Sequence, residues 1–179
     1  LKEQLAPSKV SLVRNNEDGE NGSRSCGMDC SICPMLESTK ACHFTSSSTK
    51  MTYKIRQDIS CTSKNVVYLV RCVKHNVQGV GYTTNLKSRI ANYKNHHKKK
   101  IKSCGISQHF QEDNHIFEED FNIQPIVKIM NPPSCKEQLK KRLEQFELYW
   151  QDNLVTYEPH GMNKVVEMER ARKKLQTSA

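Results

Sequence analysis

The stretch NVVYLVRCVKHNVQGVGYTTNLKSRIANY, residues 65–93, decides the fold of this 179-residue chain. It opens with an apolar, β-branched run, residues 66–70, which predicts a buried strand. Polar residues and a glycine follow, and a second short run at residues 79–82 predicts the other strand of a hairpin. The sequence therefore places a two-stranded unit directly before a helix.

The helix after the hairpin has a regular apolar face. Leu86, Ile90 and Tyr93 fall on one side at helical spacing, so this side is expected to pack on the sheet. Thr83 or Thr84 is expected to cap the first turn.

Three polar side chains are expected to meet where the hairpin joins this helix. Arg89 and Tyr93 are four residues apart, so both project from one side of the helix, and the hairpin brings Tyr68 close to them. A phenol can hold or deprotonate a water molecule, and a guanidinium fits a phosphate bidentately. This group of residues indicates phosphodiester chemistry.

A strand tyrosine, a second strand carrying Tyr-Val-Gly and a helix with Arg-x-x-x-His or Tyr form the pattern of the GIY-YIG nucleases. The chain resembles that family, and it is most similar to the endonuclease domain that follows the reverse transcriptase in Penelope-like retroelements. The stretch NLKSRIANY also resembles the helix of the GIY-YIG domain in the bacterial excision-repair incision subunit. The likeness extends from about Leu1, where LKEQLAPSKV looks like the join to the reverse transcriptase, to Asn163.

The resemblance implies an α+β fold in which helices flank a small three-stranded antiparallel sheet, with a Cys-rich zinc-binding N-terminal extension. It implies a nuclear protein that nicks target DNA for retrotransposition. Its partners would be DNA, the element RNA and the reverse transcriptase domain of the same longer polypeptide. By the same resemblance, Tyr68 orients or deprotonates the attacking water and Arg89 neutralises charge on the phosphoryl oxygens.

One position departs from the family pattern. Gly79 stands where the family has its second tyrosine, so the sequence reads QGVGYT in place of QYVGYT. Loss of a positioned acid–base group typically costs about 10²- to 10⁴-fold in rate. Tyr82 is expected to point to the opposite face of the strand from Gly79, whereas Tyr93 lies one turn from Arg89 and is the better substitute.

Composition favours an anionic partner and metal sites. The chain has 28 Lys and Arg against 19 Asp and Glu, a net charge of +9, and nucleic acid is the simplest partner for such a charge. No apolar run approaches the ~18 residues of a membrane span, so no membrane partner is expected. Eight cysteines and seven histidines at irregular spacing indicate metal sites in a reducing compartment rather than secreted disulfides.

The first cysteine cluster predicts a zinc site. Cys26, Cys30 and Cys33 place three thiols within eight residues, which is typical of a loop that wraps one tetrahedral zinc. Cys42, His43 or Cys61 can supply the fourth ligand, and an unliganded cluster is the alternative. The resembling family has a cysteine at the position of Cys61, which favours that residue.

A second candidate zinc site combines Cys72, His75, His109 and His115. The first two lie between the strands as C-x-x-H and the others follow downstream, an acceptable ligand set for zinc. The Penelope-like family has two metal-binding cysteines in this insert, and His75 replaces the second one. Cys104 is a rival ligand, and the alternative is one buried and one exposed histidine with no metal.

Cations around the first helix form a candidate track for the phosphate backbone of a nucleic acid. A solvated helix end is the simpler interpretation, and the two are compatible. The residues concerned are Lys87, Lys94, Lys98, Lys99, Lys100 and Lys102.

Residues 134–154 give the clearest helix, and Glu147 lies beside its apolar stripe without a cation at helical spacing. Such an acid needs a partner from elsewhere; the resemblance implies that Glu147 holds the catalytic Mg²⁺ or Mn²⁺, and a partly exposed acid is the alternative. Glu144 differs, because Lys140 and Lys141 are ordinary helix-surface partners for it.

Before this helix, residues 117–130 are expected to form a third strand with an edge or bulge at Pro125.

The segment after the long helix ends with a Pro-x-Gly turn and Asn163, which the resemblance implies steadies the active-site face; a turn asparagine is the alternative. The expected organisation is a linker at 1–25 with at most a short helix at its start, a Cys-rich segment at 26–63, a nuclease core at 64–164 and a charged tail at 165–179. This tail is expected to be either a solvated helix or frayed.

The sequence thus supports a metal-dependent DNA endonuclease, weakened by Gly79. A non-cleaving zinc-containing module that binds nucleic acid is the main alternative, and a zinc-stabilised interaction domain without a nucleic-acid role is a third possibility.

Overall fold

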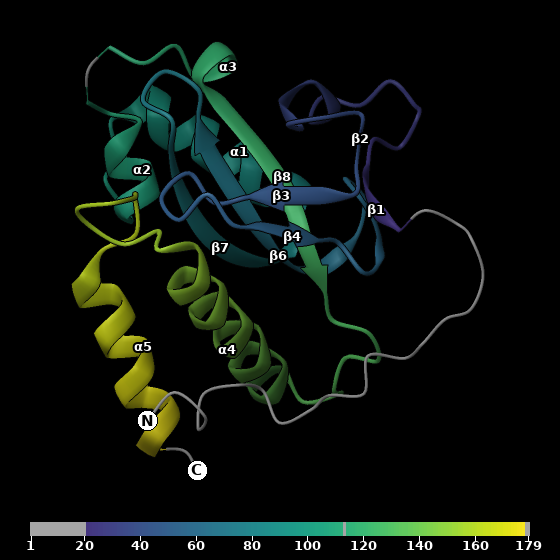
Figure 1. Ribbon diagram of the computed structural model, residues 1–179, viewed down its shortest axis with the longest axis vertical. Coiled ribbons are helices and arrows are strands. Elements are labelled where there is room, and N and C mark those ends of the chain that lie inside the picture. Colours follow the sequence, from purple (N-terminus) through teal and green to yellow (C-terminus); the bar gives the residue numbers. More distant parts are fainter. Residues whose placement is uncertain (1–20, 113, 178–179) are drawn as a thin grey trace.

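The computed structural model describes residues 21–112 and 114–177 (Figure 1). It is a mixed α+β structure with small sheets and several helices, which confirms the fold class expected at that level. In chain order the elements are β1 (Gly22–Arg24), the 3₁₀ turn η1 (Cys33–Met35), β2 (Lys40–Ala41), β3 (His43–Thr45), β4 (Thr52–Lys54), β5 (Asp58–Ser60), β6 (Lys64–Cys72), β7 (Val77–Asn85), α1 (Leu86–Lys99), α2 (Gly105–His109), α3 (Phe117–Asp120), β8 (Phe121–Lys128), α4 (Lys136–Leu154) and α5 (Val165–Thr177).

The central sheet has the strand order β7–β6–β8, and both pairings are antiparallel. β6 lies in the middle because residues 66–70 are apolar on both faces, and each of them is at most 1% exposed. β8 is an outer strand, and its pairing with β6 shifts register between Val67 and Tyr68, next to Pro125. The edge strand and the bulge expected from Pro125 are therefore both present.

Two predicted boundaries are wrong for local reasons. β7 continues to Asn85, so Asn85 rather than Thr83 or Thr84 caps α1, and its side chain accepts the Ser88 N–H at 3.0 Å. The strand predicted over residues 117–130 begins only at Phe121. The four residues before it form α3, since the Asp120 carboxylate accepts the Ile116 N–H at 2.8 Å and closes a helical turn.

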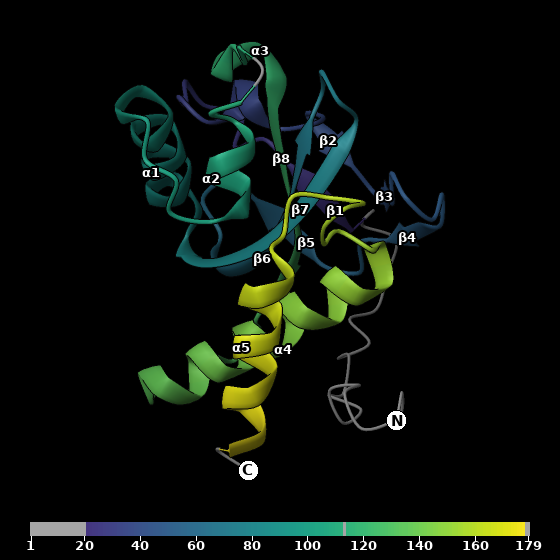
Figure 2. The same ribbon diagram turned by 90° about the vertical axis from the view of Figure 1, so that its left-hand side faces the viewer.

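The sheet is covered on both faces. Helices α1 and α2 lie on one side, and the hairpin of β3 and β4 lies on the other (Figure 2). Trp150 of α4 packs edge-on against Phe44 and Tyr53 of this hairpin, with ring centroids 5.0 Å and 5.2 Å away. The hairpin and α4 thus share one apolar layer.

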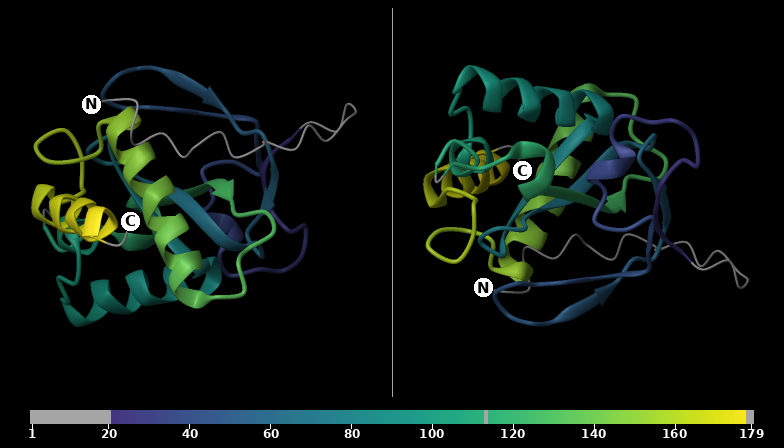
Figure 3. Two further views of the ribbon diagram at one scale, coloured as in Figure 1. Left: turned by 90° about the horizontal axis from the view of Figure 1, so that it is seen from below. Right: turned by 90° about the horizontal axis from the view of Figure 1, so that it is seen from above.

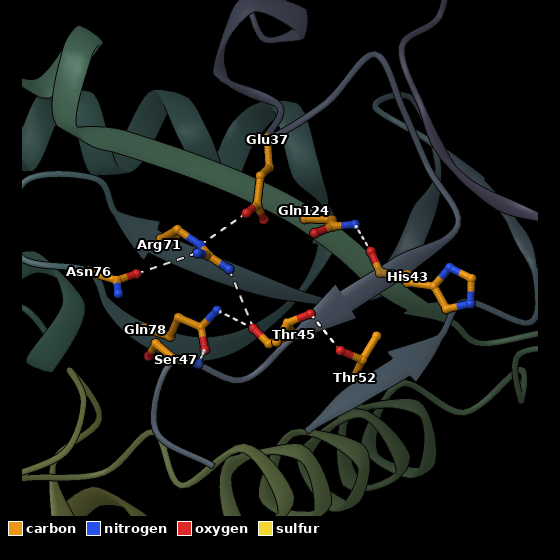
Figure 4. Close-up of polar contacts among 9 residues, drawn as sticks. All are labelled: Glu37, His43, Thr45, Ser47, Thr52, Arg71, Asn76, Gln78 and Gln124. Atoms are coloured by element: carbon orange, nitrogen blue, oxygen red, sulfur yellow. Dashed lines mark hydrogen bonds and ion pairs between the residues drawn. The ribbon is translucent and has the colours of Figure 1, made fainter. Parts of the chain in front are cut away.

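Polar side chains fasten the hairpin to the sheet (Figure 4). Buried Gln78 donates to the Thr45 carbonyl at 2.9 Å and accepts the Ser47 N–H at 2.8 Å. Gln124, 3% exposed, donates to the His43 carbonyl at 3.2 Å. The two amides thus bond to main-chain groups of the hairpin, and these bonds satisfy the buried side chains, since buried polar groups are nearly always hydrogen-bonded.

The N-terminal part contributes more structure than the sequence predicted. Residues 21–25 were assigned to the linker, but β1 pairs with β2 and β5 there in a small sheet. The rest of the predicted linker, including the short helix at its start, lies outside the described residues. Ile32, Ile55 and Ile59 join the same apolar cluster as the central sheet, so the Cys-rich segment packs on the core.

The charged tail forms a helix, which is one of its two expected forms, but one side of α5 is buried because it packs against α4 (Figure 3). Leu148 of α4 and Met168 and Leu175 of α5 form a small buried cluster. Arg172 forms an ion pair with Asp152 across the same interface. The apolar side chains recur at helical spacing within the charged stretch, so they bury one narrow face.

Candidate active site and metal centres

A pocket of about 240 Å³ opens where the outer strand β7 meets α1, α4 and α5. Five side chains that the sequence singled out line it: Tyr68 from β6, Arg89 and Tyr93 from α1, Glu147 from α4, and Asn163. The fold thus gathers into one pocket residues that are almost 100 positions apart in the chain.

The two tyrosines form the floor of the pocket. Tyr68 is 1% exposed and Tyr93 is 5% exposed, and their hydroxyls hydrogen-bond to each other at 2.9 Å. Gly81 makes room for this pair, since a Cβ atom there would lie only 2.5 Å from the Tyr68 hydroxyl oxygen. Burial raises the pKa of both phenols, and Arg89 opposes the rise, so both are neutral at physiological pH.

Arg89 is held at the pocket by the hairpin. Its Nη2 donates to the Tyr82 carbonyl at 3.3 Å, which orients the guanidinium on the half-buried side of α1. Arginine stays protonated in proteins and has further N–H donors in its planar fork. Arg89 therefore places a fixed positive charge beside the two phenols.

Glu147 has no hydrogen-bond or ion-pair partner within the part of the chain that the structure describes. Burial raises the pKa of its carboxyl to about 8, and Glu144 and Glu167 add to the rise while Arg89 lowers it. Removal from water and two like charges both disfavour the anion. A bound cation would reverse both effects, so the carboxylate is a chemically suitable ligand for a divalent ion.

Glu144 differs from its prediction as a surface residue. It is only 8% exposed, and it accepts a hydrogen bond from the Tyr82 hydroxyl at 3.2 Å. Lys140 is 3.9 Å away as expected, but Lys174 of α5 approaches to 3.5 Å as well. Tyr82 and Lys174 come from other elements of the fold, so helical spacing alone does not reveal them as partners of Glu144. Tyr82 also lines the pocket.

Asn163 steadies the outer edge of β7. Its Oδ1 accepts the Val80 N–H at 2.8 Å and its Nδ2 donates to the Val80 carbonyl at 2.8 Å, so the amide copies a strand neighbour. Thr156 donates to the same Oδ1 at 2.8 Å. Both polar atoms of the Asn163 amide are occupied by these hydrogen bonds. Asn163 therefore affects the pocket by fixing the position of β7.

The space beside Gly79 is already filled. A Cβ atom there would lie 2.8 Å from Cγ1 of Ile106 and 3.2 Å from Cβ of Met162. Ile106 comes from α2 and is 3% exposed. A side chain at position 79 would therefore meet an isoleucine that comes from another element.

Pocket residues that the sequence did not predict include Gln151, Glu167 and Met168. Gln151 follows Glu147 by four residues on α4, so helical spacing contained a signal for it. Glu167 and Met168 belong to α5, and no local signal connected that helix to the pocket.

The first cysteine cluster brings four thiols together. Cys26, Cys30, Cys33 and Cys61 each have a sulfur within 4.8 Å of the others, and the closest pairs are 3.4, 3.6 and 3.9 Å apart. Four thiolates around a tetrahedral zinc are separated by about 3.8 Å, because each Zn–S bond is about 2.3 Å. This group can hold a metal ion and is compatible with zinc. Cys42 and His43 belong to no such group among residues 21–112 and 114–177.

The second group of possible metal ligands lies at the turn that joins β6 to β7. Ligand atoms of Cys72, His75, His109 and His115 also lie within 4.8 Å of one another. The Cys72 sulfur is 3.3 Å from Nε2 of His115, and Nδ1 of His75 is 3.4 Å from Nε2 of His109. These spacings are close to the ~3.3–3.5 Å that a tetrahedral zinc with one sulfur and three nitrogen ligands requires.

Two further observations concern these ligands. The thiol of the rival ligand Cys104 contacts the Ser107 hydroxyl at 3.4 Å, and this cysteine lines the pocket instead of joining the histidines. All eight cysteines of the chain are free thiols.

The basic residues lie mainly on the surface of α1 and the loop after it. Lys87, Lys98, Lys99, Lys100 and Lys102 are exposed, and Lys94 is half-buried in an ion pair with Glu118 at 2.8 Å. Lys100 ends α1 in a left-handed conformation, which turns the chain away from the helix axis.

Comparison with known proteins assigns no class to this arrangement: no protein-family model, curated protein or solved structure matches the chain. None of the helices in residues 21–112 and 114–177 has the length and apolar character needed to span a membrane.

Proposed function

We propose that the chain is a metal-dependent DNA endonuclease of the GIY-YIG type. The observation that carries the proposal is the convergence of Tyr68, Tyr93, Arg89 and Glu147 on one pocket from three separate elements. Phosphodiester hydrolysis needs a group that orients water, a cation for the phosphoryl oxygens and a ligand for a divalent ion. Each of these needs has a residue of the right type in this pocket.

The residues divide the work by their chemistry. Arg89, fixed by the Tyr82 carbonyl, offers its remaining N–H donors to the scissile phosphate. The hydrogen-bonded Tyr68 and Tyr93 hydroxyls hold and orient the attacking water, since their raised pKa keeps them neutral donors and acceptors. Glu147 would hold Mg²⁺ or Mn²⁺, which supplies Lewis-acid charge for the phosphate when bound.

The fit of that ion rests on the donors present. Glu147 is an oxygen ligand without a hydrogen-bond or ion-pair partner among the described residues, and hard divalent cations prefer oxygen. Apart from Cys104, which lines the pocket, the sulfur and imidazole groups that could bind a metal together lie in the two clusters that we assign to structural zinc.

The biological setting follows from the same proposal. The chain would nick target DNA in the nucleus for retrotransposition, as the nuclease part of a longer polypeptide that includes a reverse transcriptase. The exposed lysines on and after α1 would contact the DNA backbone.

A plasmid-nicking assay tests the proposal. With zinc sites loaded, the wild-type chain should convert supercoiled plasmid to the nicked form only when Mg²⁺ or Mn²⁺ is added. Glu147→Gln keeps the shape of the side chain and should reduce nicking by about 10²-fold or more. Equal nicking by Glu147→Gln would contradict the assignment of the metal ligand.

A non-cleaving nucleic-acid-binding module is the second candidate, and the filled space beside Gly79 favours it. It predicts no nicking by the wild-type chain with either ion, but binding to DNA that weakens as salt rises. Lys98→Ala with Lys99→Ala should lower the salt slope of DNA binding by about 2, since each phosphate contact adds about 0.9. Lys54→Ala, an exposed lysine on the hairpin across the sheet, is the matched control. DNA binding that does not respond to salt would contradict both candidates and favour a zinc-stabilised interaction domain.

A further inference from the structure

Gln151 is a buried side chain of the pocket with an unused acceptor. It is 5% exposed, lines the pocket with Glu147, and its Oε1 accepts no hydrogen bond from residues 21–112 or 114–177. A buried amide oxygen without a partner is uncommon in proteins, and a bound water or ion is the usual explanation.

The orientation of this amide is set by the strand beside it. Nε2 of Gln151 faces the Val80 carbonyl at 3.5 Å, where a rotated amide would bring two oxygens together. Asn163 donates to the same carbonyl at 2.8 Å. Val80 is therefore an acceptor for both amides, and Oε1 of Gln151 is left without a donor among the described residues.

The placement relative to Glu147 suits a shared ligand. The two residues are four apart on α4, so their side chains project from one face of the helix. Both offer oxygen, which is the donor that Mg²⁺ and Mn²⁺ prefer. Glu167 of α5 lines the same pocket and adds negative charge at an exposed position.

We propose that the amide oxygen of Gln151 is a second protein ligand of the divalent cation held by Glu147, with Glu167 adding electrostatic attraction. The inference rests on the proposed nuclease site and deepens it. α5, which covers the pocket through Glu167 and Met168, is then part of the metal site.

Binding of Mn²⁺ tests this without any need for cleavage. Electron paramagnetic resonance of free Mn²⁺, recorded during titration of the zinc-loaded chain, gives its dissociation constant. Gln151→Leu keeps most of the volume and removes the oxygen, and it should raise that constant about tenfold. Gln151→Glu places a charged oxygen at the same point and should lower it. Glu167→Gln should weaken binding less than Gln151→Leu, because Glu167 is hydrated.

Gln145→Leu is the matched control, because Gln145 is a half-buried glutamine of α4 outside the pocket lining. Zinc content and thermal unfolding show whether each variant is folded, and Gln151→Glu provides the answer if Gln151→Leu is not. An unchanged Mn²⁺ constant in folded Gln151 variants would overturn the inference, and Glu147→Gln separates that result from failure of the nuclease site. If Glu147→Gln abolishes binding while the Gln151 variants do not affect it, the proposed function stands and this inference is wrong. No Mn²⁺ binding by the wild-type chain would overturn both.

Discussion

The molecule contains two kinds of candidate metal site that differ in how far they are assembled. In the two cysteine–histidine groups, all four ligand atoms already lie within 4.8 Å of one another. In the pocket, Glu147 lies half-buried with a raised pKa and no protein partner, and its carboxylate belongs to no such group among the described residues. Under the function we propose, the two assembled groups would hold ions that stabilise the fold, and Glu147 would hold a weakly bound, exchangeable ion.

The largest effect on stability is expected when one cysteine of the four-thiol group is replaced. Cys61 is 1% exposed and belongs to the apolar core as well as to the thiol group. Cys61→Ser should reduce zinc content from two ions to one per chain. It should also remove a large part of the roughly 10–16 kcal/mol that zinc contributes in small zinc domains. Elemental analysis and thermal unfolding measure the two outcomes.

Cys135→Ser is the control for this change, because Cys135 is exposed and belongs to neither group. It should leave zinc content and unfolding unchanged. A Cys61→Ser chain that keeps both zinc ions and the wild-type unfolding temperature would show that the thiol group is not a structural site.

Replacing a residue of the pocket should lower the nicking rate without lowering the stability of the fold. Arg89→Lys keeps the positive charge but loses the planar fork that fits a phosphate. Nicking should fall about 10²-fold, as it does when one oriented donor is removed from other active sites. Zinc content and the Mn²⁺ dissociation constant should not change, and Arg170→Lys on the exposed side of α5 should leave the rate unaltered. If Arg89→Lys lost as much zinc as Cys61→Ser, the pocket and the zinc groups would not be independent.

The sequence predicted the assembled groups better than the pocket, for a physical reason. Cysteine and histidine have few roles at such spacing, so Cys26, Cys30 and Cys33 indicate a site before any fold is known. The pocket depends on tertiary neighbours. Glu144 looked like a surface residue because its partners Tyr82 and Lys174 come from other elements.

The same reason explains why the sequence left the packing of α5 open. The charged stretch of α5 buries only Met168 and Leu175. The sequence therefore allowed a solvated helix, and the burial of one side of that helix depends on its packing against α4. β6, in contrast, was predicted correctly, because five consecutive apolar residues can only be buried on both faces.

Gly79 offers a smaller and more specific test of the pocket. Gly79→Tyr alone should lower stability and leave nicking low, since its Cβ would lie 2.8 Å from the Ile106 side chain. Gly79→Tyr with Ile106→Ala opens that space for the phenol, and nicking should rise about tenfold or more above the wild-type rate. Ile106→Ala alone is the control, and it should only destabilise the chain by about 2–4 kcal/mol. A double variant no faster than wild type would mean that the missing phenol does not limit the rate.

The smallest effect concerns stability against pH in buffer without Mg²⁺ or Mn²⁺. Burial raises the pKa of Glu147 from 4.5 to about 8, so the folded chain keeps a proton that the unfolded chain releases above pH 4.5. The free energy of unfolding should therefore fall as pH rises from 4.5 to 8 and become level above that. Water at the pocket mouth screens the charge, so we expect a fall of about 1–2 kcal/mol from this group. Glu147→Gln removes the titrating group and should flatten this part of the profile, which chemical denaturation at several pH values measures. A slope that is the same in both chains would place Glu147 in a hydrated environment, and added Mn²⁺ should flatten the wild-type profile only if the carboxylate binds the ion.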